Sequence, residues 1–165
     1  MQSDKLLVFI IIIATCFILS CEGENNENQN EITSEVTEQS DCKSFTKSDD
    51  TETSCIEYVY YLSDKKLLVR HINAGFNCCP GDIYCESAIS NDTIIISEFE
   101  ETQDCDCNCL YDINIEISNL NATNYIIKVV EPYLGSQEEI IFSIDLDSDT
   151  TGSYCVYRTQ YPWGL

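Results

Sequence analysis

Eight short runs of β-branched and aromatic residues, separated by polar breaks, follow one another after Thr53. Many of these runs alternate apolar with polar side chains, which is the period of a half-buried strand. No window repeats apolar residues at i, i+3, i+4 and i+7 over three turns, as an amphipathic helix would. We therefore predict an all-β domain over residues 54–165, folded as a single antiparallel β-sandwich of about eight strands. The expected strands are Cys55–Leu62, Leu67–Ala74, Ile83–Ser90, Thr93–Glu100, Cys107–Ile117, Asn124–Glu131, Glu138–Leu146 and Ser153–Tyr161.

One stretch, Cys105–Ile117, combines this alternation with three cysteines. If it is extended throughout, its odd positions carry three cysteines, a tyrosine and three isoleucines, while its even positions are mostly polar. Successive side chains of a strand point to opposite faces, so the isoleucines mark the odd face as the core face. We expect Cys105, Cys107 and Cys109 to continue this core stripe toward one end of the sandwich.

The first twenty residues read as a targeting segment. Lys5 precedes the apolar stretch Leu6–Leu19, which is long enough for a signal sequence and short for a membrane span of about 20 residues. The stretch ends in Ile-Leu-Ser-Cys, which resembles the bacterial lipobox. We expect residues 1–20 to be a lipoprotein signal peptide and Cys21 to be the lipidated residue; an ordinary signal peptide or an uncleaved short anchor is the alternative.

Residues 21–53 begin with a strongly acidic, polar run that contains no Lys or Arg before Cys42. Low hydrophobicity with high negative charge cannot offset the entropy cost of ordering, so we predict a lipid-anchored, disordered acidic tether. Acidic residues directly after the lipidated Cys resemble the export signal of outer-membrane lipoproteins in Bacteroidota. We expect an outer-membrane anchor, with the domain facing the periplasm or the cell surface.

The charge of the chain excludes one class of partner. Eight Lys and Arg stand against 29 Asp and Glu, for a formal net charge of −21. A chain of this charge repels phosphate backbones, so we expect no binding to nucleic acid. A protein or glycan partner is left open, and the membrane is expected to be reached only through the lipid anchor.

Nine of the eleven cysteines lie outside Cys16 of the signal segment and Cys21. An oxidising envelope compartment favours disulfides in small domains, and an odd number leaves at least one thiol unpaired. Cysteines two apart on one strand are at the outer limit of bridging distance, so Cys105, Cys107 and Cys109 should bond elsewhere. The nearest supply is Cys78, Cys79 and Cys85, with Cys78 and Cys79 expected to bind different partners. The disulfide candidates are Cys42, Cys55, Cys78, Cys79, Cys85, Cys105, Cys107, Cys109 and Cys155.

A thiolate metal site is the alternative for the same cysteines. Soft sulfur ligands suit Zn²⁺ or Cu⁺, although structural zinc sites usually take their ligands from knuckle turns, and a flat strand spreads its ligands further apart than such a turn does. The candidate ligands on this reading are Cys78, Cys79, Cys105, Cys107, Cys109 and His71. On the disulfide reading no cofactor is expected.

Aromatic residues offer one further binding chemistry, a platform for carbohydrate. Its candidates are Tyr58, Tyr60, Tyr61, Tyr154, Tyr157, Tyr161 and Trp163, although strand tyrosines more often half-bury in a sandwich.

Two motifs between His71 and Val130, Asn-Cys-Cys-Pro at 77–80 and Cys-x-Cys-x-Cys-x-Tyr-Asp at 105–112, resemble those of a group of small Bacteroidota lipoproteins with no assigned activity. The resemblance implies a lipoprotein and no reaction. The residues themselves offer no nucleophile–base pair, phosphate loop or paired acids with suitable spacing. We therefore expect a non-enzymatic binding or structural module without catalytic residues.

Overall fold

The computed structural model describes residues 31–43 and 53–160, and these form nine β-strands and no helix. This part of the chain accordingly offers no helix that could cross a membrane. The strands are β1 (Thr33–Gln39), β2 (Thr53–Tyr61), β3 (Lys66–Asn77), β4 (Ile83–Ser90), β5 (Thr93–Glu100), β6 (Asn108–Ser118), β7 (Asn124–Val130), β8 (Ile141–Asp145) and β9 (Thr151–Tyr157).

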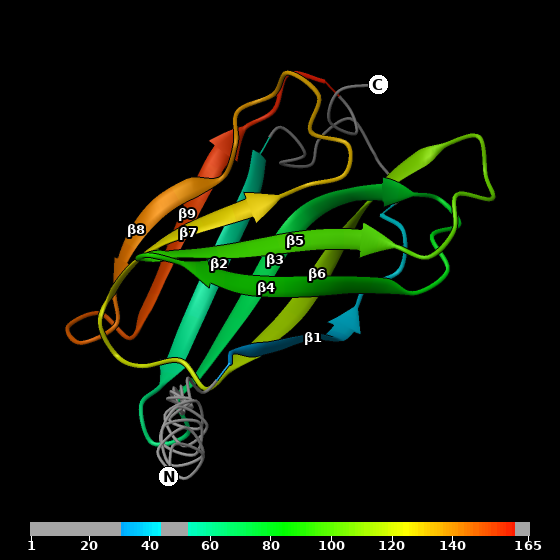
Figure 1. Cartoon of the computed structure of the whole chain (residues 1–165). Coiled ribbons are helices and arrows are strands. Elements are labelled where there is room, and N and C mark those ends of the chain that lie inside the picture. The colour runs from blue at the N-terminus through cyan, green and yellow to red at the C-terminus, as the bar shows by residue number, and fades with distance from the viewer. Residues whose placement is uncertain (1–30, 44–52, 161–165) are drawn as a thin grey trace, which may run out of the picture.

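The strands form two sheets that pack face to face (Figure 1). Sheet A has the order β1-β6-β3-β2-β9, and sheet B has the order β4-β5-β7-β8. All pairs are antiparallel except β5 with β7, which run parallel. The edge strand β1 lies beside the edge strand β4 in Figure 1. On the other side of the sandwich the edge strands β8 and β9 lie side by side. The predicted all-β sandwich of mostly antiparallel strands is confirmed.

The core follows the alternation of the sequence. Ile113, Ile115 and Ile117 of β6 are each at most 1% exposed, and their polar neighbours face outward. Ile94 and Ile96 of β5 are fully buried from the other sheet. Apolar side chains at every second position of facing strands give each sheet one buried face, which is why the two sheets stack.

An edge of the sandwich is closed by aromatic rings. Phe142 of β8 stacks on Tyr154 of β9 with ring centroids 4.8 Å apart, and Tyr58 of β2 lies 6.3 Å from Phe142. Tyr58 pairs with Gly152 across β2 and β9, and a Cβ at Gly152 would come within 2.6 Å of the Tyr58 hydroxyl oxygen. Glycine is therefore required there because the tyrosine ring occupies the space of a side chain.

The strand β1 corrects the expected tether. Residues 33–39 pair with β6 from Thr33 opposite Ser118 to Gln39 opposite Ile113, with one shift of register between Val36 and Glu38. The prediction of a disordered tether through residue 53 is therefore wrong over Thr33–Gln39, where hydrogen bonding to an otherwise unpaired edge of β6 orders a polar segment. The predicted signal peptide, the lipidation site Cys21 and residues 44–52 lie outside the described residues.

Candidate functional site

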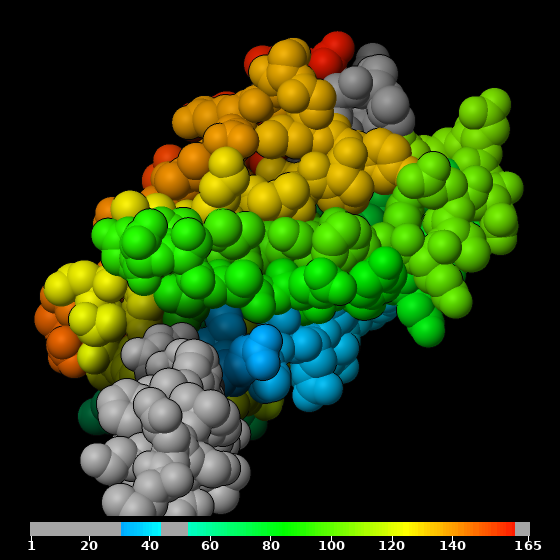
Figure 2. All heavy atoms as spheres, in the orientation of Figure 1, coloured from blue at the N-terminus to red at the C-terminus, as the bar shows by residue number. Residues whose placement is uncertain are grey.

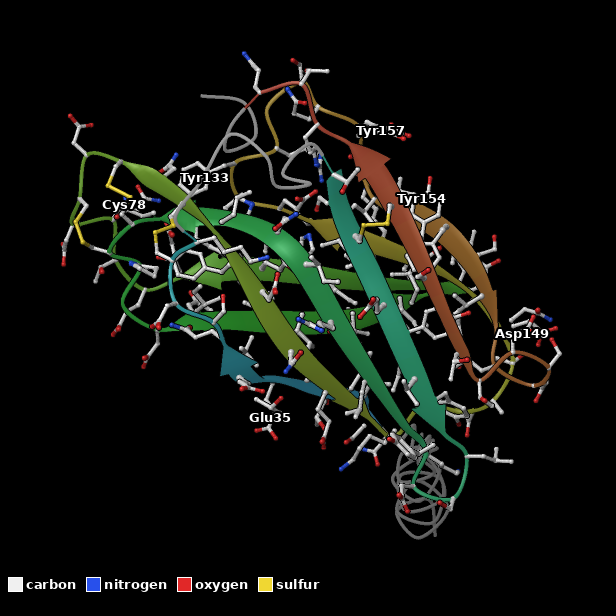
Figure 3. The ribbon with its side chains drawn as sticks, turned by 180° about the vertical axis from the view of Figure 1, so that it is seen from behind. Glu35, Cys78, Tyr133, Asp149, Tyr154 and Tyr157 are labelled. Atoms are coloured by element: carbon white, nitrogen blue, oxygen red, sulfur yellow. A yellow bond between two sulfur atoms is a disulfide. The ribbon has the colours of Figure 1, made fainter. Side chains whose placement is uncertain are left out.

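Two neighbouring disulfides join the loop after β3 to the segment before β6. Cys78 bonds to Cys107 and Cys79 bonds to Cys105, with Cα atoms 5.6 and 5.4 Å apart. We call these four residues the cysteine pole. Figure 3 shows it around the labelled Cys78, at the opposite end of the molecule from the β8–β9 turn that carries Asp149. The expectation that Cys78 and Cys79 take different partners is confirmed.

The side chain of Asn77 organises the backbone of the cysteine pole. Its Oδ1 accepts hydrogen bonds from the backbone N–H groups of Cys79 (2.9 Å) and Cys105 (3.2 Å). Its Nδ2 donates to the carbonyl of Cys105 at 2.6 Å. The backbone N–H of Cys78 donates to the carbonyl of Cys107 at 2.9 Å, and Tyr111 Oη donates to the carbonyl of Asn77 at 3.1 Å. Four of these hydrogen bonds cross between the two sides, three to the segment before β6 and one to Tyr111 of β6, and none of them involves a sulfur atom.

The cysteines at 105, 107 and 109 do not form one core stripe, so that expectation is wrong in part. Strand β6 begins at Asn108, so Cys105 and Cys107 lie in the preceding segment, where Cys107 is exposed. Cys109 alone is in the core, at 1% exposure, and it bonds to Cys42 with Cα atoms 5.7 Å apart. Cys105 and Cys107 therefore take their partners from the expected group of Cys78, Cys79 and Cys85, whereas Cys109 does not.

The remaining two bonded cysteines, Cys55 of β2 and Cys155 of β9, form a cross-strand disulfide. Their Cα atoms are 4.0 Å apart, and their side chains lie on the outward face of sheet A. Eight of the nine candidate cysteines are thus in disulfides, and Cys85 of β4 is a buried free thiol. Burial raises the pKa of Cys85 to about 11, against a hydrogen bond with Ser34 that lowers it.

A cluster of buried polar side chains lies between the sheets. His71 of β3 is 0% exposed; its Nδ1 is 2.7 Å from Glu98 Oε1 of β5, and its Nε2 is 2.8 Å from Ser54 Oγ of β2. Ser54 is also 0% exposed, and Glu98 is 3% exposed. The hydrogen bonds therefore join sheet A to sheet B through the imidazole ring.

A second ion pair extends the same cluster. Arg158, just after β9, donates from one terminal nitrogen to Glu131 Oε2 at 2.5 Å and from the other to the carbonyl of Glu138 at 2.6 Å. Glu131 Oε1 lies 3.8 Å from His71 Nε2. Two basic groups thus face the two carboxylates of Glu98 and Glu131, so a protonated His71 makes the buried cluster electrically neutral.

Burial disfavours the charged form of His71, but the carboxylates of Glu98 and Glu131 outweigh burial, and the pKa of His71 is raised above its ordinary value of 6.5. Burial raises the pKa of Glu131, although His71 and Arg158 oppose the rise. A protonated imidazole donates from both ring nitrogens, so it has no lone pair with which to accept a proton from Ser54.

Hydrogen bonds link Ser54 to His71 and His71 to Glu98, as in the Ser–His–acid arrangement of a catalytic triad. Burial limits what this arrangement can do chemically. The hydroxyl of Ser54 and the imidazole of His71 are both closed to solvent, so a substrate cannot reach them without opening of the sandwich. The cluster can hold the two sheets together, and it can hold a proton on His71. In this structure the cluster has no nucleophile that a substrate can reach.

Sequence reasoning missed Ser54, Glu98, Glu131 and Arg158, although a signal for two of them exists. Glu98 shares the period-two face of Ile94 and Ile96, and Ser54 shares that of Ile56. A polar residue on an apolar face of a strand must find a partner. The sequence could thus have flagged both residues, but it could not have paired them with His71, because the pairing depends on how the two sheets stack.

The six candidate metal ligands are not all gathered in one place. Cys109 is bonded to Cys42, and His71 is held in the core by Ser54 and Glu98, away from the cysteine pole. Across the described ranges, no three His, Cys, Asp or Glu side chains are arranged to hold a metal ion. The six-residue ligand set of the alternative, metal-binding reading is therefore not assembled in this oxidised form of the protein.

The five described residues of the predicted aromatic platform do not come together as one exposed surface. Tyr58 and Tyr60 are buried, Tyr154 stacks on Phe142, and only Tyr61 and Tyr157 are well exposed, at 45% and 75%. Tyr161 and Trp163 lie outside the described residues.

A different aromatic pair lies on the outward face of sheet B, the side of the molecule seen in Figure 2. Tyr84 of β4 and Phe99 of β5 are cross-strand neighbours that stack with centroids 5.3 Å apart. They are 46% and 37% exposed, because the residues flanking them, Cys85 and Glu98, take the inward positions.

Comparison of the chain with protein-family models, with curated proteins and with solved structures found no match. What can be said of its function therefore rests on the geometry of its own residues.

Proposed function

We propose that this chain is an envelope lipoprotein, anchored through Cys21 to the outer membrane, whose β-sandwich is a non-enzymatic binding or structural module. The observation that carries the non-enzymatic part is the closure of the Ser54–His71–Glu98 cluster. Its serine and histidine are both 0% exposed, and the histidine is held between carboxylates that favour its protonated form. A hydrolase needs the opposite arrangement, an accessible hydroxyl beside a neutral imidazole.

The four disulfides support the proposed location outside the cytoplasm. Disulfides persist in oxidising compartments and are rare where glutathione and thioredoxin keep thiols reduced. The domain would face either the periplasm or the cell surface.

The partner we propose is a protein or a glycan. The net charge of −21 repels nucleic acid and anionic headgroups, so contact with the membrane would run through the lipid alone.

Lipidation is tested by growth of expressing cells with labelled palmitate. The full chain should incorporate label into a band that partitions into detergent, and Cys21→Ala should abolish both incorporation and partitioning. Cys16→Ala is the matched control in the same apolar segment and should retain the label. Incorporation that survives Cys21→Ala would refute the anchor.

The non-enzymatic part is tested with the oxidised protein and generic ester, glycoside and peptide substrates. No turnover above buffer is expected. Ser54→Ala removes the hydroxyl that is hydrogen-bonded to His71 and changes little volume, so turnover by the wild type that this variant loses would overturn the proposal.

A further inference from the structure

The two disulfides of the cysteine pole are redundant as staples. Cys78 and Cys107 are 29 residues apart in sequence, and Cys79 and Cys105 are 26 apart, so both bonds join the same two segments. A disulfide stabilises chiefly by closing a loop in the unfolded chain, and its effect grows with the logarithm of the loop length. Once either bond has formed, the other closes only the few residues left between them. Loop closure in the unfolded chain therefore explains the stabilising effect of one of the two disulfides, but the second adds very little in this way.

Hydrogen bonds that involve no sulfur atom hold the backbone of the cysteine pole in place. Asn77 joins the two segments through its two hydrogen bonds to the backbone of Cys105, and it also accepts from the N–H of Cys79 in its own segment. The Cys78 N–H donates to the Cys107 carbonyl. On the far side of the first loop, Thr102 donates from its hydroxyl to the Cys79 carbonyl at 3.1 Å and from its N–H to the Pro80 carbonyl at 2.9 Å. If both disulfides were reduced, these contacts would keep four thiols together.

Four thiols so held match the requirements of a tetrahedral metal ion. In a Zn²⁺ site with Zn–S bonds of about 2.3 Å, neighbouring sulfur atoms lie about 3.8 Å apart. The Cα atoms across the pole are 5.6 and 5.4 Å apart, and consecutive residues such as Cys78 and Cys79 are separated by about 3.8 Å. The four cysteines thus lie on two facing segments that are close enough for their side chains to reach one ion.

The pole is open to solvent and lies in a negative field. Cys79 and Cys107 are exposed, so a reductant and a metal ion can both reach the sulfurs. Asp104 and Asp106 flank Cys105, and both are exposed. With few basic residues in the chain, this field concentrates divalent cations near the pole.

We propose that reduction of the Cys78–Cys107 and Cys79–Cys105 disulfides converts the cysteine pole into a four-thiolate site for Zn²⁺. Two molecules of a dithiol supply four electrons and four protons, break the two S–S bonds and leave as two disulfides. Zn²⁺ then binds the four sulfurs and displaces their protons to solvent. This goes beyond the proposed function, and it excludes Cys109 and His71 as ligands, because Cys109 bonds to Cys42 and His71 lies in the core.

The test uses Co²⁺ as the spectroscopic probe and the purified chain reduced anaerobically with a phosphine, which adds no competing thiol. The reduced protein should bind one Co²⁺ with sulfur-to-cobalt charge-transfer absorption and the visible bands of a tetrahedral site, and Zn²⁺ should displace it. The oxidised protein should bind none. Reduced wild type that gives no charge-transfer band, or an oxidised protein that gives the same band, overturns the proposal.

Two double variants locate the site. Cys79→Ser/Cys105→Ser should lose the charge-transfer band, because it removes two of the four ligands. Cys55→Ser/Cys155→Ser is the matched control, because it also removes two cysteines that form one disulfide. These two lie on the outward face of sheet A, so this variant should keep the band. A band that survives the first variant and disappears in the second would refute the assignment.

A measurement on the wild type alone guards against variants that do not fold. Zn²⁺ is added to the reduced protein, accessible thiols are alkylated, and the modified positions are mapped by peptide mass. Cys78, Cys79, Cys105 and Cys107 should be protected by Zn²⁺ and become reactive when a chelator is added. Protection of Cys42 and Cys109 in their place would overturn the proposal.

Discussion

His71 and Glu98 face each other from opposite sheets, with Nδ1 of the imidazole 2.7 Å from Oε1 of the carboxylate and both side chains at most 1% exposed. An ion pair closed off from water in this way depends on the protonation of its histidine. Its energetic consequences can be separated from those of the surrounding apolar core by pH, because the chain has only one histidine.

The first prediction concerns that pH dependence. Burial alone would lower the pKa of His71, but Glu98 and Glu131 raise it above 6.5. A raised folded-state pKa contributes stability that is fully present below the unfolded value of about 6.5 and is lost as pH rises through the folded value. The free energy of unfolding in urea, measured with disulfides intact, should therefore fall as pH rises above about 6.5. The single imidazole resonance in NMR should titrate above 6.5, and Glu98→Gln should lower that pKa and flatten the slope. Titration of wild-type His71 below 6.5 would contradict this account.

Arg158 provides the second prediction. Removal of one partner of a buried ion pair leaves the other charge without compensation, at a cost of about 3–5 kcal/mol. Arg158→Ala strips Glu131 of its 2.5 Å partner and should lower the free energy of unfolding by that amount. Arg70→Ala is the surface control: its side chain is 50% exposed beside Asp112, and its loss should cost at most about 1 kcal/mol. Equal urea midpoints for the two variants would show that the buried ion pair contributes no more to stability than the exposed one.

The contact of Gly152 with Tyr58 gives a prediction about packing. A methyl group at position 152 would meet the tyrosine ring at 2.6–2.7 Å, so Gly152→Ala should destabilise the fold by about 1–3 kcal/mol. Tyr58→Leu removes the ring, so the double variant Gly152→Ala/Tyr58→Leu should be less destabilised than the sum of the two single variants. Thermal or urea unfolding of all four proteins completes the cycle, and strict additivity would mean that the two residues do not compete for the same space.

Cys85 gives the fourth prediction. Burial raises the pKa of its thiol to about 11, so at pH 8 only about one thiol in a thousand is ionised, and that one is shielded from reagents. The oxidised native protein should react with no alkylating agent at pH 8 within minutes, whereas the unfolded, unreduced chain from residue 22 onward should take up one equivalent. Two or more reactive thiols in the unfolded chain would mean that a disulfide described here is not formed.

The β-sandwich could be predicted from the sequence because most strands carry their own signal, a period of two between apolar and polar residues. The strand β1 carries little of it, since Val36 and the preceding Ile32 are the main apolar residues that this segment packs against the core, and most residues of β1 are exposed. Its order comes from pairing with β6 and from the nearby Cys42–Cys109 bond. Neither is visible in a segment whose composition alone predicts disorder.

The cysteine pairing could be predicted only where local geometry governs it. The spacing of Cys105, Cys107 and Cys109 indicates that they do not bond to one another, and they do not. The choice of Cys42 over Cys85 as the partner of Cys109 depends on which face of which sheet each residue takes. Cys85 lies inward on sheet B opposite Glu98, so it is directed into the core and not toward β6.

The order of strands in sheet A also determines when the protein can finish folding. A chain that emerges N-terminus first presents Cys42 and Cys55 long before their partners, which follow 67 and 100 residues later. During that interval the nearest oxidisable neighbour of Cys42 is Cys55, which gives a non-native bond. Strand β2 likewise waits for β9, the last strand to appear. Early oxidation during synthesis or export would therefore trap the wrong connectivity, and native sheet A requires either thiols kept reduced until the whole domain has emerged or an isomerase that reshuffles them afterwards.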